Sequence, residues 1–162
     1  MASIQDAFKQ ALASWASGVT VVSTKLDGNM YGLTASSFSS LSLEPPLVLV
    51  CLASTNRLPS MIKESQQFAV SILAHGQEEI SNSFARPGRE PTPDFDGYAG
   101  KLTTNDQPII PDCAAYLACD VHDLIIQGDH CIAIGRVIEA AADDTQQPLI
   151  YYRRAYHTVG NS

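Results

Sequence analysis

Between Gly32 and Ser40 the chain reads Gly-Leu-Thr-Ala-Ser-Ser-Phe-Ser-Ser, a run of small residues that carries five hydroxyl groups. The run lies between a hairpin signal at Asp27-Gly28 and an apolar stretch at 47–51, so strands are expected on both sides of it. Small side chains let backbone amides come close to a planar ligand, and the hydroxyls can bind its polar edge. A serine-rich turn is the alternative interpretation.

Strand-like segments extend this pattern over the rest of the chain. Short alternating or uniformly apolar runs predict strands at 19–24, 30–36, 47–52, 68–73, 115–126, 131–141 and 149–154. Helices are predicted at 58–63 and 77–84, and a first helix follows an N-cap at Ser3, keeps an apolar face as far as Trp15 and is ended by Gly18. The proline-rich stretch 86–112 is expected to be irregular. Many antiparallel strands with peripheral helices indicate a mainly β fold, a closed barrel with helices at its ends.

The composition describes one ordinary globular domain over residues 1–162, with 45% hydrophobic residues. A formal net charge of −7 argues against a nucleic-acid partner, because binding a polyanion needs a basic face. No apolar run approaches the roughly 20 residues that cross a bilayer. The N-terminal residues have no basic segment followed by an apolar one, so no secretory signal and a cytoplasmic location are expected.

The cysteines and histidines indicate no metal site. Cys51, Cys113, Cys119 and Cys131 form no C-x-x-C pair, and the four histidines share no helical or strand spacing. Each cysteine lies in an apolar or strand-like stretch, so reduced, buried thiols are expected.

A second candidate site lies where the apolar strand after Pro45-Pro46 ends. Its residues are Cys51, Leu52, Ala53, Ser54, Thr55, Asn56 and Arg57. Hydroxyls, an amide and a guanidinium that lead into a helix N-terminus can hold a phosphate group. The alternative is a strand-to-helix turn whose polar side chains only cap the helix.

Two further candidates lie in the second half of the chain. Gly128-Asp129-His130 occupies a predicted hairpin tip, where Asp129 can orient or charge the imidazole, which can then bind a phosphate or shuttle a proton. A surface histidine is the alternative. The stretch 151–157 ends the chain with aromatic rings and two arginines, and its alternative is a terminal strand with solvated charges. Sequence signatures of a Rossmann domain, a P-loop and a hydrolase nucleophile elbow are all missing.

Several motifs, taken in order, resemble the flavin reductase family, whose fold is the FMN-binding split barrel. They are Gly18-Val19-Thr20-Val21-Val22, 32–38, 45–51, 68–74, Phe84-Ala85, Gly128-Asp129-His130 and 148–153. The resemblance runs from about Phe8 to Tyr156, and Arg154 stands where the family often has Gly.

The resemblance implies a homodimer of Greek-key-like antiparallel split barrels. It implies reduction of FMN or FAD by NADH or NADPH, with reduced flavin passed to a separate partner monooxygenase. By position, the flavin ring edge would meet Thr34, Ala35, Ser36 and Ser37. Cys51, Leu52, Ala53 and Ser54 would run beside the flavin, and its phosphate would meet Ser54, Thr55, Asn56 and Arg57. Phe84 and Ala85 would close over the ring or ribityl chain, and His130, with Tyr152, Arg153 and Tyr156, would face the nicotinamide nucleotide.

Three alternatives stay open at this point. The first is an oxidase or acceptor reductase that keeps its flavin tightly bound, and the second is a non-enzymatic flavin-binding electron carrier. The third is a barrel used only for dimerisation or partner binding. The choices between FMN and FAD and between NADH and NADPH also stay open. The cations eligible to bind a ribose 2′-phosphate are Arg86, Arg89, Arg153 and Arg154.

Overall fold

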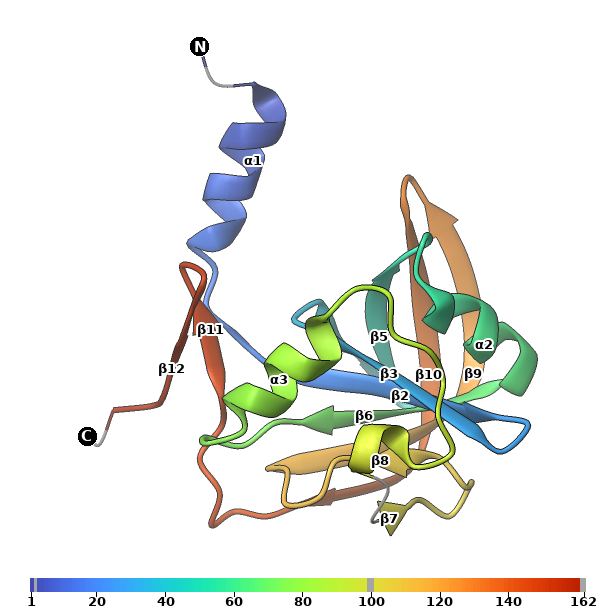
Figure 1. Ribbon diagram of the computed structural model, residues 1–162. Helices are drawn as coiled ribbons and strands as arrows, with labels where there is room; N and C mark the ends of the chain where they lie inside the picture. The colour runs from blue at the N-terminus through green and yellow to red at the C-terminus, as the bar shows by residue number, and fades with distance from the viewer. Residues whose placement is uncertain (2, 99–100, 161–162) are drawn as a thin grey trace.

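The computed structural model describes residues 1, 3–98 and 101–160 (Figure 1). Seven strands form one antiparallel sheet in the order β3-β2-β6-β9-β10-β5-β4. Their bounds are β2 (Thr20–Leu26), β3 (Asn29–Ala35), β4 (Phe38–Leu43), β5 (Pro46–Ala53), β6 (Gln67–Ile72), β9 (Ala115–Gln127) and β10 (His130–Ala142). The prediction of a mainly β, antiparallel fold with peripheral helices is therefore confirmed.

The two edge strands of the sheet are joined by one short connection. Strands β3 and β4 lie at opposite ends of the sheet order, yet only Ser36 and Ser37 separate them along the chain. A connection of this length spans only about 10 Å, so the sheet must curl until its two edges come close. This produces the expected split barrel, and we call the Ser36–Ser37 connection the seam.

The barrel interior is filled by alternate side chains of the strands and closed at one end by a helix. Val22, Val50 and Phe68 are fully buried there. Helix α2 (Arg57–Ser65) adds the buried side chains of Leu58, Met61 and Ile62. Gly135 in β10 lets the sheet pack against Phe68, because a Cβ added at Gly135 would lie 2.5 Å from Phe68 Cζ.

A second core cluster lies between helix α3 (Glu78–Ala85) and the segment that follows it. The rings of Phe84 and Phe95 are both buried, with their centroids 4.9 Å apart. Phe95 belongs to the short 3₁₀ helix η1 (Phe95–Gly97). Leu73 and Leu149 complete the cluster, which fastens α3 to the outside of the barrel.

The described parts of the stretch 86–112 contain more regular structure than the sequence predicts. The Arg89 guanidinium forms an ion pair with Asp96 and donates to the carbonyl of Gly32 at 2.8 Å. The short strands β7 (Lys101–Leu102) and β8 (Pro108–Ile109) pair with each other. Ser23 donates its hydroxyl to the Pro108 carbonyl, so the segment is tied to β2 as well as to β3.

The chain ends differ from the prediction in two respects. Helix α1 (Ile4–Ala13) ends at Ala13 with Ser14 as its C-cap, so Gly18 does not end it and instead belongs to β1 (Ser17–Gly18). The single strand expected at 149–154 is a hairpin of β11 (Ile150–Tyr152) and β12 (Ala155–His157). Arg153 and Arg154 form its turn with φ of +48° and +63°, values that single-sequence turn signals assign to Gly or Asn.

Helix α1 stands outside the barrel, above the β11–β12 hairpin (Figure 1). Its last turn is joined to that hairpin by the Arg153 amide, which donates to the Ala13 carbonyl at 3.0 Å. Strand β1 pairs with β11, which fixes the chain between helix and barrel. In the described part of the chain, no helix has both the length and the apolar character needed to cross a membrane.

Candidate functional site

The hydroxyl-rich run crosses the seam, and three of its hydroxyls, those of Thr34, Ser37 and Ser39, already form hydrogen bonds. The Ser37 hydroxyl donates to the Cys51 carbonyl at 2.6 Å, and the Cys51 amide donates to the Ser37 carbonyl at 3.2 Å. Thr34 donates its hydroxyl to the Ser81 carbonyl at 2.6 Å, which ties β3 to α3. Segments 34–37 and 51–53, predicted from separate motifs, therefore lie side by side.

The donors of Ser36 have no protein partner within the described residues. Within the described residues its hydroxyl has no hydrogen-bond partner, and the amides of Ser36 and Ser37 have no backbone acceptor. Both residues are exposed. The seam thus offers two N–H groups and one hydroxyl in adjacent positions, a donor set suited to carbonyl oxygens or ring nitrogens of a planar ligand.

Three hollows meet at Ser36. The largest, of about 680 Å³, lies between α1, the seam and the β11–β12 hairpin, and we call it the α1 groove. A second, of about 260 Å³, lies between β3, α3 and Tyr156, and a third, of about 340 Å³, lies beside Trp15 and Phe38. Ser36 lines all three, so the hollows adjoin one another, and together they make up the depression around the seam.

The wall between α3 and β12 is held by hydrogen bonds. The Tyr156 hydroxyl lies 2.8 Å from the Ser81 hydroxyl and donates to the Asn82 side-chain oxygen at 2.8 Å. Ala85 lines the same hollow. Phe84 points the other way, into the second core cluster, so its ring supports this wall from behind.

The charge of the α1 groove is opposite to that of the whole chain. Its lining contains Lys9, Arg153 and Arg154 and no acidic residue, whereas the chain carries a formal net charge of −7. The Arg153 guanidinium lies over the Tyr152 ring, with its central carbon 5.2 Å from the ring centroid. The groove is therefore a local attraction for anions on a protein that repels them overall.

The strand end at 54–57 combines both interpretations offered by the sequence. Asn56 is the N-cap of α2 and accepts from the Leu58 amide at 3.0 Å, as the capping alternative predicts. Arg57 forms an ion pair with Glu90 at 2.8 Å, so its charge is already partnered. Ser54 and Thr55 are exposed, which leaves their hydroxyls facing solvent.

His130 lies next to this strand end, at the tip of the β9–β10 hairpin. It pairs with Ala53 in the sheet, and the Ser54 amide donates to the Asp129 carbonyl at 2.9 Å. The His130 Nδ1 atom lies 2.7 Å from Asp129 Oδ1, and this hydrogen bond lowers the pKa of Asp129 below its ordinary value. The expected orientation of the imidazole by Asp129 is therefore present. Neither His130 nor residues 54–57 line the three hollows at the seam.

Several residues around the seam were not anticipated from the sequence. Lys9, Trp15 and Ser17 line the α1 groove, and Ser81 joins β3 to β12. Trp15 is the residue among these that the sequence could have indicated, because an apolar face that leads from a short helix to a tryptophan needs a partner surface. Lys9 and Ser81 carry no local motif.

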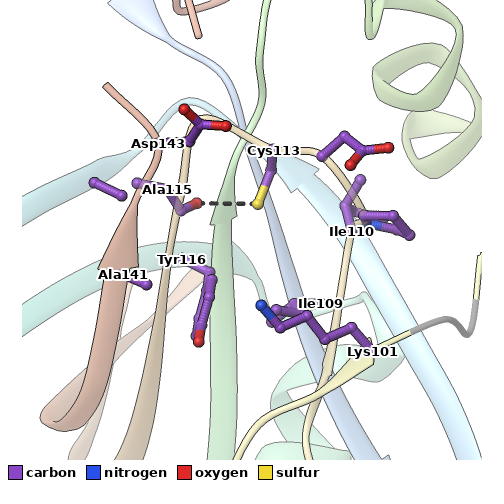
Figure 2. A pocket seen from close by; sticks show the side chains of 11 residues that line it. Lys101, Ile109, Ile110, Cys113, Ala115, Tyr116, Ala141 and Asp143 are labelled. Carbon is purple, nitrogen blue, oxygen red and sulfur yellow. Dashed lines mark hydrogen bonds between the residues drawn. The ribbon is translucent and has the colours of Figure 1, made fainter. Parts of the chain in front are cut away.

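Another hollow, of about 370 Å³, lies elsewhere, between the β8–β9 connection and the paired ends of β9 and β10 (Figure 2). The Cys113 thiol points into it and donates to the Ala115 carbonyl at 3.3 Å. Burial raises the pKa of Cys113, which keeps it protonated rather than nucleophilic. None of the residues predicted to contact a ligand lines this hollow.

The prediction of four buried thiols is only half right, since Cys51 and Cys113 are partly exposed and Cys119 and Cys131 are buried.

The chain matches a protein family and curated relatives over nearly its whole length. Residues 12–160 match the family model for the flavin reductase like domain. The reductase component of 4-hydroxyphenylacetate 3-monooxygenase from Thermus thermophilus is 37% identical over 96% of this chain and 97% of its own length. A probable flavin reductase of Rhizobium meliloti is 39% identical over 94% of this chain, which spans only 48% of that relative.

Solved structures give the same result. BorF, the flavin reductase component of a bacterial two-component tryptophan halogenase, superposes with a TM-score of 0.90 at 29% identity, covering 98% of this chain and 99% of its own. An NADH:FAD oxidoreductase of Streptomyces globisporus, solved with NAD and FAD fragments, also has a TM-score of 0.90 at 29% identity, over 99% of this chain and 96% of its own. A match in both sequence and structure over nearly the whole chain shows that this protein belongs to the flavin reductase family.

Proposed function

We propose that this chain reduces FMN or FAD with NADH or NADPH and releases the reduced flavin to a partner monooxygenase. The observation that carries the proposal is the meeting of three predicted segments at the seam. The hollows that share Ser36 are also lined by Thr34 and Ser37 of the seam region, by Cys51 near the end of β5, and by Tyr151 and Tyr156 of the terminal hairpin. The names of the Thermus and Rhizobium relatives support the same activity.

The donor set at the seam fits the polar edge of a flavin ring. A bound flavin supplies the redox chemistry, since it accepts a hydride from a reduced nicotinamide. Ser36 would donate with its hydroxyl and amide, and Ser37 with its amide, to the polar edge of the bound ring, where donors stabilise the negative charge of the reduced form. The bonds of Ser37 to Cys51 and of Thr34 to Ser81 hold the seam in place, so its donors need no rearrangement when a ligand arrives.

The strand end and the hairpin tip supply the remaining contacts. The flavin phosphate would be held by Ser54, Thr55 and the N-terminus of α2, which Asn56 caps. Arg57 would exchange its ion pair with Glu90 for a contact with the phosphate. His130, oriented by Asp129, would bind the nicotinamide nucleotide or supply a proton. Tyr152, Arg153 and Tyr156 would border the same nucleotide, and Ala85 would cover the inner side of the ring.

The proposal includes a homodimer. Helix α1 buries none of its own residues, and its side chains Ile4, Phe8 and Leu12 are 78%, 61% and 54% exposed. Trp15, just after the helix, is 76% exposed. An apolar stripe of this size is stable only against another apolar surface, and a second copy of the chain supplies one. All four cysteines are free thiols, which supports a reducing, cytoplasmic location.

A visible spectrum of the purified protein, followed by nicotinamide oxidation assays, tests the activity. NADH and NADPH oxidation would be measured with and without added FMN or FAD, and we expect turnover that saturates with added flavin. A bound yellow chromophore without nicotinamide oxidation would instead identify an electron carrier. Protein that neither binds flavin nor oxidises either nicotinamide would overturn the proposal.

A further inference from the structure

We propose that Ser81 is a positioning residue of this site. Its hydroxyl holds the ring of Tyr156 at the hollow beside the seam, so that the Tyr156 hydroxyl anchors the ring and gives no proton to a ligand. Ser81 lies in α3 and is 1% exposed. The inference rests on the proposed flavin reductase activity and deepens it, because it names the residue that fixes one wall of the depression.

Helix α3 is a fixed support for this wall. The Phe84 ring is fully buried in the second core cluster, where it packs against Phe95. In addition, Thr34 donates its hydroxyl to the Ser81 carbonyl at 2.6 Å. Because α3 is held at these two points, the Ser81 side chain has a defined position relative to β3 and to the seam that follows it.

Strand β12 has less support of its own. It is an edge strand, since the order of its sheet is β1-β11-β12, and its strand partner is β11. Among the residues that the structure describes, the hydrogen bonds that join β12 to anything other than β11 are the two of the Tyr156 hydroxyl, with Ser81 and with Asn82. The position of Tyr156 at the hollow therefore depends on α3.

The direction of these two bonds follows from the protons available. A phenol has one proton, and Tyr156 donates it to the side-chain oxygen of Asn82 at 2.8 Å. In the 2.8 Å contact between the two hydroxyls, Ser81 must therefore be the donor and the Tyr156 oxygen the acceptor. The bonds form a directed chain from Ser81 through Tyr156 to Asn82.

This chain determines what Tyr156 can do for a ligand. Its proton is engaged with Asn82, so the hydroxyl has none to give to a bound nucleotide. Its ring lies 5.4 Å from that of its cross-strand partner Tyr151, centroid to centroid, and both tyrosines line the hollow that Ser36 also lines. Tyr156 therefore meets a ligand with its ring, which Tyr151 holds at the side and Ser81 holds at the hydroxyl.

Burial of Ser81 makes this arrangement the favoured one. If Tyr156 moved away from α3, the Ser81 hydroxyl would lose its acceptor in a place that water barely reaches, and a buried donor without a partner costs free energy. The bond to Ser81 therefore limits the movement of the hairpin residue that borders the ligand.

Three variants test the proposal. Ser81→Ala removes the donor and keeps the Ser81 carbonyl as acceptor for Thr34, Tyr156→Phe removes the acceptor and keeps the ring, and the third variant carries both changes. Steady-state kinetics with the nicotinamide and the flavin varied in turn would give kcat and both KM values, and flavin titration would give the Kd. Hydrogen exchange of the amides of residues 150–157 would report whether the hairpin has loosened.

Each substitution has a matched control. Ser23→Ala is the control for Ser81→Ala, because Ser23 is also buried and donates its hydroxyl to a carbonyl, that of Pro108. Tyr116→Phe is the control for Tyr156→Phe, because the Tyr116 hydroxyl donates to Glu139 at 2.8 Å and lies away from the seam. Urea unfolding of all the variants shows whether they fold.

We expect Ser81→Ala and Tyr156→Phe each to raise the nicotinamide KM about three- to tenfold, as loss of one positioning hydrogen bond does. Values of kcat and of the flavin Kd should stay within about threefold of wild type. The doubly substituted protein should match the single variants rather than show the product of their effects, since all three lack the same bond. Exchange of the amides of 150–157 should be faster in all three. Both controls should keep the nicotinamide KM within about twofold.

Two results would overturn the proposal. One is a fall in kcat of about 100-fold or more in Tyr156→Phe, the effect of losing a general acid, which would make its hydroxyl a proton donor. The other is a Ser81→Ala protein that equals Ser23→Ala in both the nicotinamide KM and the hydrogen exchange of 150–157. Failure of the reductase activity would appear separately, as absence of flavin-dependent turnover in wild type. Hydrogen exchange needs no ligand, so it would then still decide whether Ser81 holds Tyr156.

Discussion

Ser37 and Cys51 bond to each other in both directions, with the serine hydroxyl donating to the cysteine carbonyl at 2.6 Å and the cysteine amide donating to the serine carbonyl at 3.2 Å. One residue belongs to the seam and the other to the strand that runs beside it. The pair therefore positions the amide of Ser37 and the donors of the adjacent Ser36, which we propose bind the flavin ring.

Ser37→Ala tests this positioning. Loss of one partly solvated hydrogen bond should lower the free energy of unfolding by about 0.5–1.5 kcal/mol, and flavin affinity should fall as well because the seam is less well held. Urea unfolding and flavin titration measure the two effects. Thr145→Ala is the control, since the Thr145 hydroxyl donates to the Asp143 carboxylate at 2.6 Å, away from the seam and from α2. Equal loss of flavin affinity in both variants would contradict the assignment.

His130→Ala should mainly raise the KM for the nicotinamide substrate, by about tenfold. The imidazole is the group beside the strand end that can bind a nucleotide phosphate, and Asp129 holds it in place. Steady-state kinetics with each substrate varied in turn separates the two KM values. His122→Ala, at an exposed position on β9, should leave both unchanged. A large fall in flavin affinity with an unaltered nicotinamide KM would refute this role.

Gly135→Ala should destabilise the barrel by about 1–3 kcal/mol, the range for overpacking a filled core. The added methyl would lie 2.5 Å from Phe68 Cζ and 2.7 Å from Cys119 Cβ, distances that force these neighbours to move. Chemical unfolding measures the change. Gly160→Ala is the matched control, because no atom lies within 4 Å of the added methyl. If the two variants are equally stable, the core around Phe68 accommodates the added methyl group and the prediction is wrong.

Arg89→Met should lower stability by about 2–4 kcal/mol, because it leaves a partly buried Asp96 without its cation. The side chain of Arg89 is 11% exposed and that of Asp96 is 29% exposed. Arg57→Met breaks a pair whose side chains are 47% and 68% exposed, so its cost should stay below about 1 kcal/mol. Thermal unfolding of both variants measures the two losses of stability. The stretch 86–112 should also become more sensitive to proteolysis in Arg89→Met alone.

Glu139 should contribute to stability near neutral pH and lose that contribution in acid. Its carboxylate accepts from the Thr104 hydroxyl and amide at 2.6 and 2.7 Å, and these bonds, with a third from Tyr116, lower the pKa of Glu139 below its ordinary value of 4.5. A folded-state pKa below the unfolded value gives stability above pH 4.5 that disappears as the pH falls further. Unfolding between pH 7 and pH 3 should therefore depend less steeply on pH in Glu139→Gln. Glu44→Gln, at an exposed turn position, should follow the wild-type curve.

Strand β4 shows why part of the sheet could not be predicted. Its sequence, Phe-Ser-Ser-Leu-Ser-Leu, has weak alternation and many serines. It forms a strand because β5 offers an unpaired edge, which is a tertiary cause that local propensity does not contain. Strands β6, β9 and β10 were predicted within two residues because their apolar alternation is long and bounded by turn signals.

The candidate site could be proposed from the sequence where donors lie close together in it, as in segments 34–37 and 54–57. Arg89 shows the limit. Nothing near it in sequence indicates that its partners are the Gly32 carbonyl and a carboxylate in a 3₁₀ helix, so its anchoring role needed the fold. The turn at Arg153 and Arg154 was missed for a different reason, because the residues in it are not the ones that turn signals contain.

The seam has a consequence for how this family can change its ligands. The same two residues, Ser36 and Ser37, both join the edges of the barrel and present donors to the depression. A wider mouth for a bulkier substrate would require those edges to separate, and a narrower one would require them to approach. The width of the depression and the separation of the barrel edges therefore cannot change independently of each other. Natural variation in substrate size should be found in α1 and the terminal hairpin, which can shift without opening the barrel.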